Sequence, residues 1–157
     1  MKIILLVVGK TNDSWAKTAI TEYEKRLKHY LPFVIEVIPD LKSTKSMTEE
    51  QVKAREAEFI LEWNKPGDLM LLLDEKGNQY SSEDFAGYLQ KKMNSGIKNL
   101  IFVVGGPYGF SNSVYSECKE TISLSKMTFS HQMVRVFFVE QIYRAMTILS
   151  GEPYHHS

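Results

Sequence analysis

The chain alternates between two patterns of apolar residues, continuous runs and helical spacing. Four short runs are almost wholly apolar and stop at glycine, proline or a polar residue; they cover residues 2–8, 33–38, 68–74 and 99–104. Such runs are typical of strands that are buried on both faces of a parallel sheet. A shorter fifth strand is expected at 121–125.

Between these runs, apolar residues recur every three to five positions, as they do in amphipathic helices. This spacing, together with capping residues and helix breakers, predicts helices over residues 14–30, 48–64, 81–94, 111–119 and 132–149. Strands that alternate with helices indicate an α/β fold, with a largely parallel sheet flanked by helices. A chain of 157 residues with no internal repeat is expected to form a single domain, 1–157.

Three loops directly follow predicted strands, at residues 73–77, 105–110 and 125–131. In parallel α/β sheets, ligands bind beyond the carboxyl ends of the strands. The sequence therefore predicts that these loops converge on a ligand site.

Two of these loops have the composition of a nucleotide site without a standard motif. "GGPYGF" (105–110) has neither the G-x-G-x-x-G spacing nor the G-K-[ST] ending of the common phosphate-binding loops. Its bare backbone would let a flat ligand approach closely, although a plain turn is the alternative. "LSKMTF" (124–129) offers main-chain polar groups between apolar side chains, which suits adenine, or it is only a connection between strand and helix.

The last predicted helix is apolar around its whole circumference. A helix of this kind is buried on all sides, either by a second copy of the chain or by its own chain. Its only charged residues are Arg135, Glu140 and Arg144. They are expected to form an Arg–Glu pair inside an interface, or to place an arginine on a phosphate.

Composition narrows the class of protein. The net charge is zero, which counts against nonspecific binding to nucleic acid. A single cysteine, Cys118, excludes an intrachain disulfide and a multi-cysteine zinc site, and no metal is expected. No secretory signal and no membrane span are expected, so the predicted location is cytoplasmic. No hydrolase motif is visible.

The tail "GEPYHHS" places Tyr154 beside His155. Terminal residues are usually frayed, but this pair combines a ring that can stack on a base with a group that titrates near neutrality.

Several segments together resemble the ribosomal RNA large subunit methyltransferase H family of the SPOUT superfamily. They are "MKIILLVVGK", "FVVGGPYGF", "ISLSKMTFSHQMVRVFFVEQIYRA" and "GEPYHH". The resemblance implies a C-terminal trefoil knot, a homodimer and S-adenosyl-L-methionine as cofactor. It also implies methylation at N3 of a pseudouridine in large-subunit ribosomal RNA, on the assembled ribosome.

The resemblance also implies site residues. The cofactor would be bound by Leu73, Gly105, Leu124, Ser125, Lys126, Met127, Thr128 and Phe129. Ser130 would cap the last helix, while His131 and Arg135 would contact the substrate.

The reaction needs a base for the N3 proton, and a histidine that titrates near pH 6.5 suits it. We therefore expect His155 to be the base, Tyr154 to stack on or bond the nucleobase, and Arg144 or Arg135 to hold a phosphate. Two alternatives are a SPOUT methyltransferase that acts on another RNA such as transfer RNA, and a non-catalytic nucleotide-binding α/β module.

Overall fold

The computed structural model describes residues 1–156; Ser157, the last residue of the predicted domain, lies outside this range. Its centre is a five-stranded sheet in the order β2-β1-β4-β3-β5, and every pair of neighbouring strands is parallel. The predicted parallel sheet is thus confirmed. The strands are β1 (Lys2–Val8), β2 (Phe33–Ile38), β3 (Leu69–Gln79), β4 (Asn99–Val104) and β5 (Glu120–Ser123).

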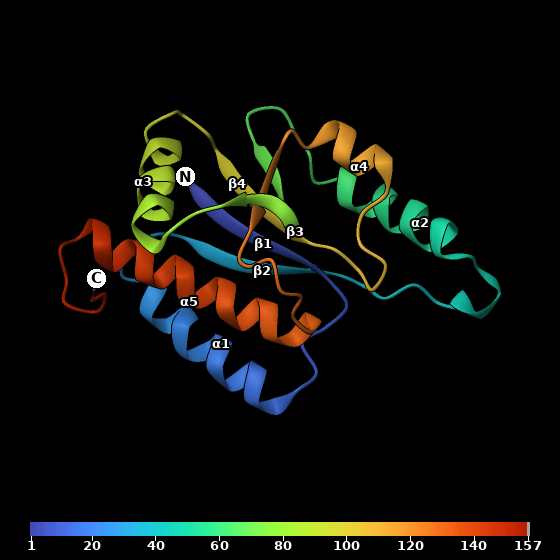
Figure 1. Ribbon diagram of the computed structural model, residues 1–157, viewed down its shortest axis with the longest axis horizontal. Helices are drawn as coiled ribbons and strands as arrows, with labels where there is room; N and C mark the ends of the chain where they lie inside the picture. Colours follow the sequence, from blue (N-terminus) through green and yellow to red (C-terminus); the bar gives the residue numbers. More distant parts are fainter. Residues whose placement is uncertain (157) are drawn as a thin grey trace.

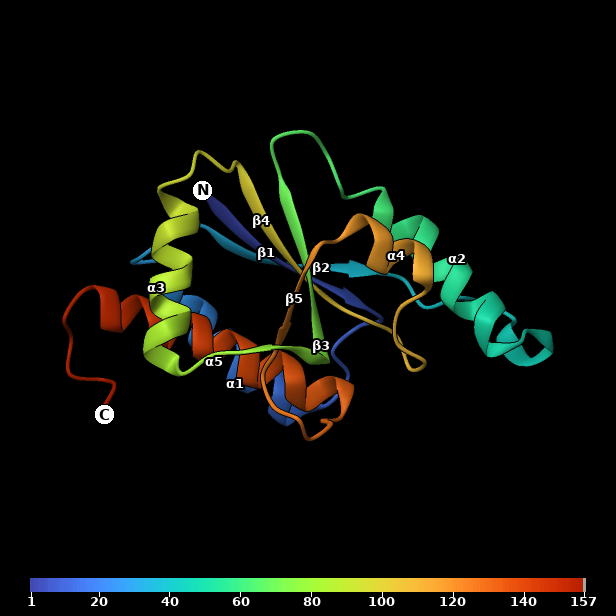
Figure 2. The ribbon, with the colours of Figure 1, turned by 45° about the horizontal axis from the view of Figure 1, so that its top comes forward.

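Helices cover both faces of this sheet (Figures 1 and 2). The helices α1, α3 and α5 lie on one face, and α2 and α4 lie on the other. The predicted α/β fold is confirmed, whereas the trefoil knot stays a prediction. The bounds are α1 (Ser14–Leu27), α2 (Glu49–Leu61), α3 (Ser82–Met93), α4 (Asn112–Glu117) and α5 (His131–Leu149), with a 3-10 turn at Thr44–Ser46.

The continuous apolar run of β1 serves two cores. Successive side chains of a strand point to opposite faces, so Ile3, Leu5 and Val7 join the core under α1, α3 and α5. The residues between them, including Ile4 and Leu6, join the core under α2 and α4. A strand in this position needs apolar residues at every place, because neither of its faces meets water.

Side-chain caps begin the helices where the sequence predicts them. The hydroxyl of Ser81 accepts a hydrogen bond from the Asp84 amide, and that of Ser130 accepts one from Met133. Thr48 and Gln51 form a complete capping box at α2. At α1 the N-cap is Asp13, whose side chain makes no capping bond.

Strand β3 is longer than predicted, because it continues past residue 74 to Gln79. Its polar second half pairs with β5 after a register shift between Leu73 and Asn78. Gly77 permits this pairing, since a Cβ there would lie 2.6 Å from the carbonyl carbon of Thr121. The hydropathy pattern misses this half because its pairing depends on a strand more than 40 residues away.

Helix α5 packs between α1 and α3 and against the sheet, where the Phe138 ring lies 4.7 Å from that of Phe102. Its own chain leaves one face open, and Phe137 on that face is 43% exposed. The chain alone therefore does not bury this apolar helix on all sides. Within residues 1–156, no helix combines the length and apolar character that crossing a bilayer requires.

A buried glutamate lies on the face of the sheet that α2 and α4 cover. Glu56 of α2 is 3% exposed, and its Oε1 has no hydrogen-bond partner among the described residues. Burial, and secondarily the negative charge of Asp40, raises the pKa of Glu56 to about 6. Between its ordinary value of 4.5 and about 6, the folded state therefore binds more protons at this group than the unfolded state. Its contribution to stability falls as the pH rises through this window.

The variant Glu56→Gln, which cannot ionise at this position, should lose this pH dependence. Its free energy of unfolding, relative to the parental protein, is expected to increase by about 2 kcal/mol between pH 4.5 and pH 7.5. Urea unfolding at the two pH values measures the difference. Glu58→Gln, at an exposed position of the same helix, controls for the loss of a negative charge. An equal difference at both pH values for Glu56→Gln would contradict the assignment.

Candidate active site

A cleft of about 590 Å³ opens beyond the carboxyl ends of β4 and β5, beside residues 73–76 of β3. It is lined by residues from all three segments that the sequence singles out, 73–77, 105–110 and 125–131. Their convergence is confirmed. The prediction of a loop at 73–77 is wrong, because these residues continue β3. The volume lies within the usual range for small-molecule sites.

The cleft lies where the chain changes sides of the sheet. The helix that follows β3 is α3, on one face, and the helix that follows the neighbouring β4 is α4, on the other (Figure 2). Connections that leave two adjacent strands in opposite directions leave a crevice between them. Strand order therefore places the cleft at this edge.

Most of the predicted cofactor residues line this cleft, whereas Lys126 does not. The loop after β5 is shaped by serines: Ser123 Oγ donates to the Ser125 carbonyl (2.8 Å), and Ser125 Oγ accepts from the Met127 amide (3.0 Å). These bonds fix the course of the loop immediately after β5. The predicted residues in the lining are Leu73, Gly105, Leu124, Ser125, Met127, Thr128 and Phe129.

The buried carboxylate of Glu56 packs against the glycine loop, residues 105–110. A Cβ at Gly106 would lie 2.2 Å from Glu56 Oε2, and one at Gly105 would lie 3.2 Å from the Phe110 ring. The pair of glycines thus lets the loop lie directly on α2 and on its own aromatic residue. The loop closes with a bond from the Gly109 amide to the Gly106 carbonyl.

The rim of the cleft is polar and carries both signs of charge. Tyr115 donates a hydrogen bond to Asp74, and Lys53 and Lys76 also line the rim. Burial, and secondarily the positive charge of Arg135, lowers the pKa of His131 from its usual value. A hydrogen bond to the Gly105 backbone acts in the opposite direction but is the smaller effect. His131 therefore lines the cleft as a neutral imidazole at neutral pH.

The structure corrects the prediction that Arg135 contacts the substrate. Arg135 is 1% exposed, and its guanidinium donates to the Val8 carbonyl (2.9 Å) and to Thr11 Oγ1 (3.0 Å). It ties α5 to the carboxyl end of β1 instead of facing outward. The sequence places this arginine one turn into an apolar helix but does not show which side faces the protein interior.

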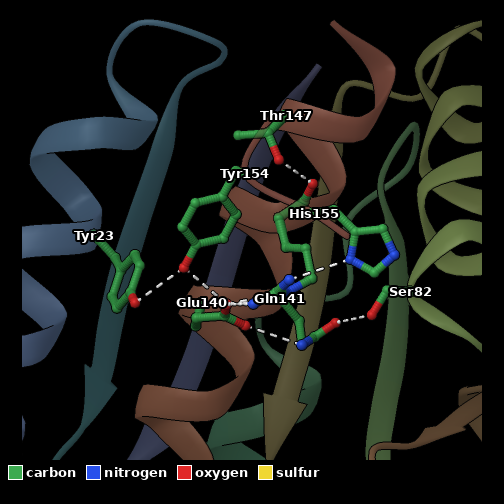
Figure 3. A network of polar contacts seen from close by, with 8 residues as sticks. Tyr23, Ser82, Glu140, Gln141, Thr147, Tyr154 and His155 are labelled. Atoms are coloured by element: carbon green, nitrogen blue, oxygen red, sulfur yellow. Dashed lines mark hydrogen bonds and ion pairs between the residues drawn. The ribbon is translucent and has the colours of Figure 1, made fainter. Parts of the chain in front are cut away.

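The predicted catalytic residues do come together, at the opposite end of α5 (Figure 3). Arg144 pairs with Glu140, as the sequence predicts, through its Nε (3.1 Å) and Nη2 (2.5 Å). Tyr154 donates to the same Glu140 oxygen (3.0 Å). The remaining nitrogen of Arg144, Nη1, lies 3.1 Å from His155 Nδ1. The tail is therefore docked on α5.

These contacts define the tautomer of a neutral His155. Arginine keeps all its protons, so Arg144 Nη1 donates and His155 Nδ1 accepts. The ring hydrogen is then on Nε2, which lies 3.3 Å from Glu83 Oε1 in the first turn of α3. The lone pair of the imidazole is at Nδ1.

The tail and the cleft of one chain are far apart. Arg144, on which the tail docks, lies 13 residues after His131 in α5, which corresponds to roughly 20 Å along the helix. His131, which lines the cleft, begins this helix, and the tail follows its last turn (Figure 1). One chain therefore does not join its predicted catalytic residues to its own cleft.

Known proteins resemble this chain over its length. Residues 1–155 match the family described as "Predicted SPOUT methyltransferase". Proteins named ribosomal RNA large subunit methyltransferase H are 59% identical in Parabacteroides distasonis and 56% identical in Christiangramia forsetii, each over 99% of both chains. The chain belongs to the SPOUT methyltransferase family. A solved structure of a probable methylase family protein from Haemophilus influenzae Rd KW20 is also similar, at 13% identity and a TM-score of 0.49, covering 95% of this chain and 66% of that one.

Some polar residues of this SPOUT methyltransferase have no signal in the sequence. Glu83 reaches His155 across 72 positions, and Tyr23 of α1 lies 3.3 Å from the Tyr154 hydroxyl. Tyr30 donates to Glu152 of the tail. This hydrogen bond, and to a smaller extent burial, raises the pKa of Tyr30 to about 12. In the sequence, only the tail and the charged pair of Glu140 and Arg144 point to this region. Residues 1–156 hold no cluster of three or more His, Cys, Asp or Glu arranged for a metal ion.

The contact between Gly106 and Glu56 predicts a specific coupling. Gly106→Ala is expected to lower the free energy of unfolding by about 1–3 kcal/mol, because its methyl group would overlap the buried carboxylate. The loss should shrink in a Glu56→Ala background, where that space is empty. Denaturant unfolding of the two single variants and the double variant measures the coupling.

Gly87→Ala provides the control, because a Cβ at this position of α3 would meet nothing within 4 Å. It should leave the protein as stable or raise its stability by up to about 1 kcal/mol. An equal cost of Gly106→Ala with and without Glu56 would show that the two positions are independent.

Proposed function

We propose that this protein transfers a methyl group from S-adenosyl-L-methionine to N3 of a pseudouridine in large-subunit ribosomal RNA, on the assembled ribosome in the cytoplasm. The observation that carries the proposal is the cleft beside β3, β4 and β5, in a chain 59% identical to a relative named for large-subunit ribosomal RNA methylation. The neutral net charge agrees with a substrate recognised by shape on a folded particle.

The cleft suits the cofactor. Leu73, Leu124 and Phe129 supply apolar walls, while Gly105 exposes main-chain groups on the facing loop. Met127 is 76% exposed beside the same cleft, as expected of an apolar side chain that a ligand or a partner covers. The bound cofactor supplies an electrophilic methyl group, so the protein's task is to align it with the nucleobase.

A homodimer accounts for the apolar surface at the beginning of α5. Exposed Met127, Phe129 and Phe137 lie there, with the Phe129 and Phe137 rings 5.0 Å apart. Trp15 of α1 is also exposed, close to the point where Gln132 accepts bonds from the amides of residues 12 and 13. Covering these side chains by a second copy removes them from water.

The same dimer would complete the active site. Two copies of α5 that pack antiparallel around a two-fold axis place the end of one helix beside the beginning of the other. Each cleft would then receive Arg144, Tyr154 and His155 from the partner. This arrangement would bridge the roughly 20 Å of helix that separates Arg144 from His131 within one chain.

In this composite site the tail performs the proton chemistry. His155 presents its lone pair at Nδ1, where the N3–H of the nucleobase would replace the N–H of Arg144 as donor. The displaced Arg144 edge is then free to hold a phosphate. The Arg144 guanidinium carbon lies 4.8 Å from the centre of the Tyr154 ring. The Tyr154 ring would stack on the nucleobase.

The test is a methylation assay with a radiolabelled methyl donor and ribosomes that lack the modification, followed by nucleoside mass spectrometry. Label is expected at pseudouridine N3 of the large-subunit RNA. His155→Ala should lower the rate by about 10²–10⁴-fold, because it removes the base, and should bind cofactor normally. His29→Ala, which removes an exposed histidine of the loop after α1, is the control. Label found in transfer RNA would refute the substrate, and a parental rate for His155→Ala would refute its role.

Mixing two inactive variants tests the composite site. Ser125→Trp fills the cleft, and His155→Ala lacks the base, so each homodimer should be inactive. After subunit exchange, activity should recover to about a quarter of the parental rate, because half of the dimers are mixed and each holds one complete site. Recovery is measured with the same ribosome assay after light scattering confirms dimers. A mixture that stays inactive although mixed dimers have formed would show that tail and cleft act within one chain.

A further inference from the structure

The geometry points to Glu140 as the positioning residue of the proposed active site: its carboxylate holds Arg144 and Tyr154 in the arrangement that they present to the substrate. This inference rests on the proposed function and adds a residue to it. Glu140 lies in the middle of α5, and its side chain is 17% exposed.

One carboxylate binds several side chains at once (Figure 3). Its Oε1 accepts from Arg144 Nε, Arg144 Nη2 and the Tyr154 hydroxyl, at 3.1, 2.5 and 3.0 Å. Its Oε2 accepts from Gln141 Nε2 at 2.9 Å. Gln141 in turn accepts from the Ser82 hydroxyl at 2.9 Å, which links the group to the first turn of α3. Glu140 therefore connects Arg144, Tyr154 and Gln141 through a single carboxylate.

The carboxylate determines where the arginine points. A guanidinium is planar, and two of its three nitrogens are occupied by Glu140. The third, Nη1, is then directed at His155 Nδ1. Charge-assisted bonds of this kind are stronger than neutral ones and strongly directional. Without Glu140, the arginine would keep its charge but lose the contact that fixes its plane.

The carboxylate also fixes the tyrosine. The Tyr154 hydroxyl lies between Glu140 and Tyr23, and its ring meets that of Tyr143 edge to face at 4.7 Å. Burial, followed by the bonds to Tyr23 and Glu140, raises the pKa of Tyr154, so the hydroxyl stays protonated and donates. Glu140 accepts this hydrogen bond, and the Arg144 guanidinium that it also holds lies over the Tyr154 ring, 4.8 Å from the ring centroid. The carboxylate thus fixes the tyrosine both directly and through Arg144.

Glu140→Gln separates positioning from folding. It keeps the size of the side chain but replaces a carboxylate that accepts three bonds at Oε1 by a neutral amide. We expect kcat on ribosomes to fall about tenfold to a hundredfold, with an unchanged KM for S-adenosyl-L-methionine and an unchanged dimer. Glu58→Gln is the matched control, because Glu58 forms an exposed pair with Arg55 in α2, on the opposite face of the sheet.

A double-variant cycle shows whether Glu140 acts through its partner. If it does, Glu140→Gln should cost much less in an Arg144→Ala background than in the parental protein. A full, multiplicative loss in the double variant would overturn the inference, as would a parental kcat for Glu140→Gln alone.

A second measurement does not depend on activity. Hydrogen exchange of the amides in residues 150–156 should become faster in Glu140→Gln, because the tail loses its anchor on α5. If the parental enzyme does not methylate ribosomes, the proposed function fails, and the exchange experiment alone decides the positioning role. Unchanged exchange in the tail would then overturn it.

Discussion

A parallel sheet has to be covered on both faces, because each connection between parallel strands crosses one face and carries a helix over it. In this chain the crossovers after β3 and β4 take opposite faces, with α3 on one and α4 on the other. The cleft beside β3, β4 and β5 is the direct result. The same requirement makes β1 apolar from Ile3 to Val8, which gives the loops at its end a rigid base.

Charges inside the fold serve the architecture around the cleft. Arg135 holds α5 to the end of β1, and Glu56 lies directly under Gly106. Both are almost fully buried and each has an atom without a partner among the described residues, so their positions carry a cost in free energy. In return, Glu56 supports the glycine loop of the proposed cofactor site, and Arg135 fixes the beginning of α5 beside it.

The length of α5 separates two tasks. Its beginning forms part of the cleft, and its second half carries the polar group of Glu140, Arg144 and the docked tail. Because a helix is stiff, the two ends of α5 stay apart within one chain. In the proposed dimer, the helix instead sets the distance between the two composite sites. The tail is anchored by α1, α3 and α5 together, which suits a group that has to meet a second molecule in a defined orientation.

The sequence by itself determined the strands, the helices and their caps, because apolar runs, helical spacing and capping residues act over a few neighbouring positions. It also determined that three segments converge, since each of them follows the apolar run of a parallel strand. Only the tertiary structure decided that Arg135 faces inward, that β3 continues to Gln79 and that Glu83 and Tyr23 meet the tail. Each of these depends on a contact between residues more than 40 positions apart, and local pattern carries no information about such contacts.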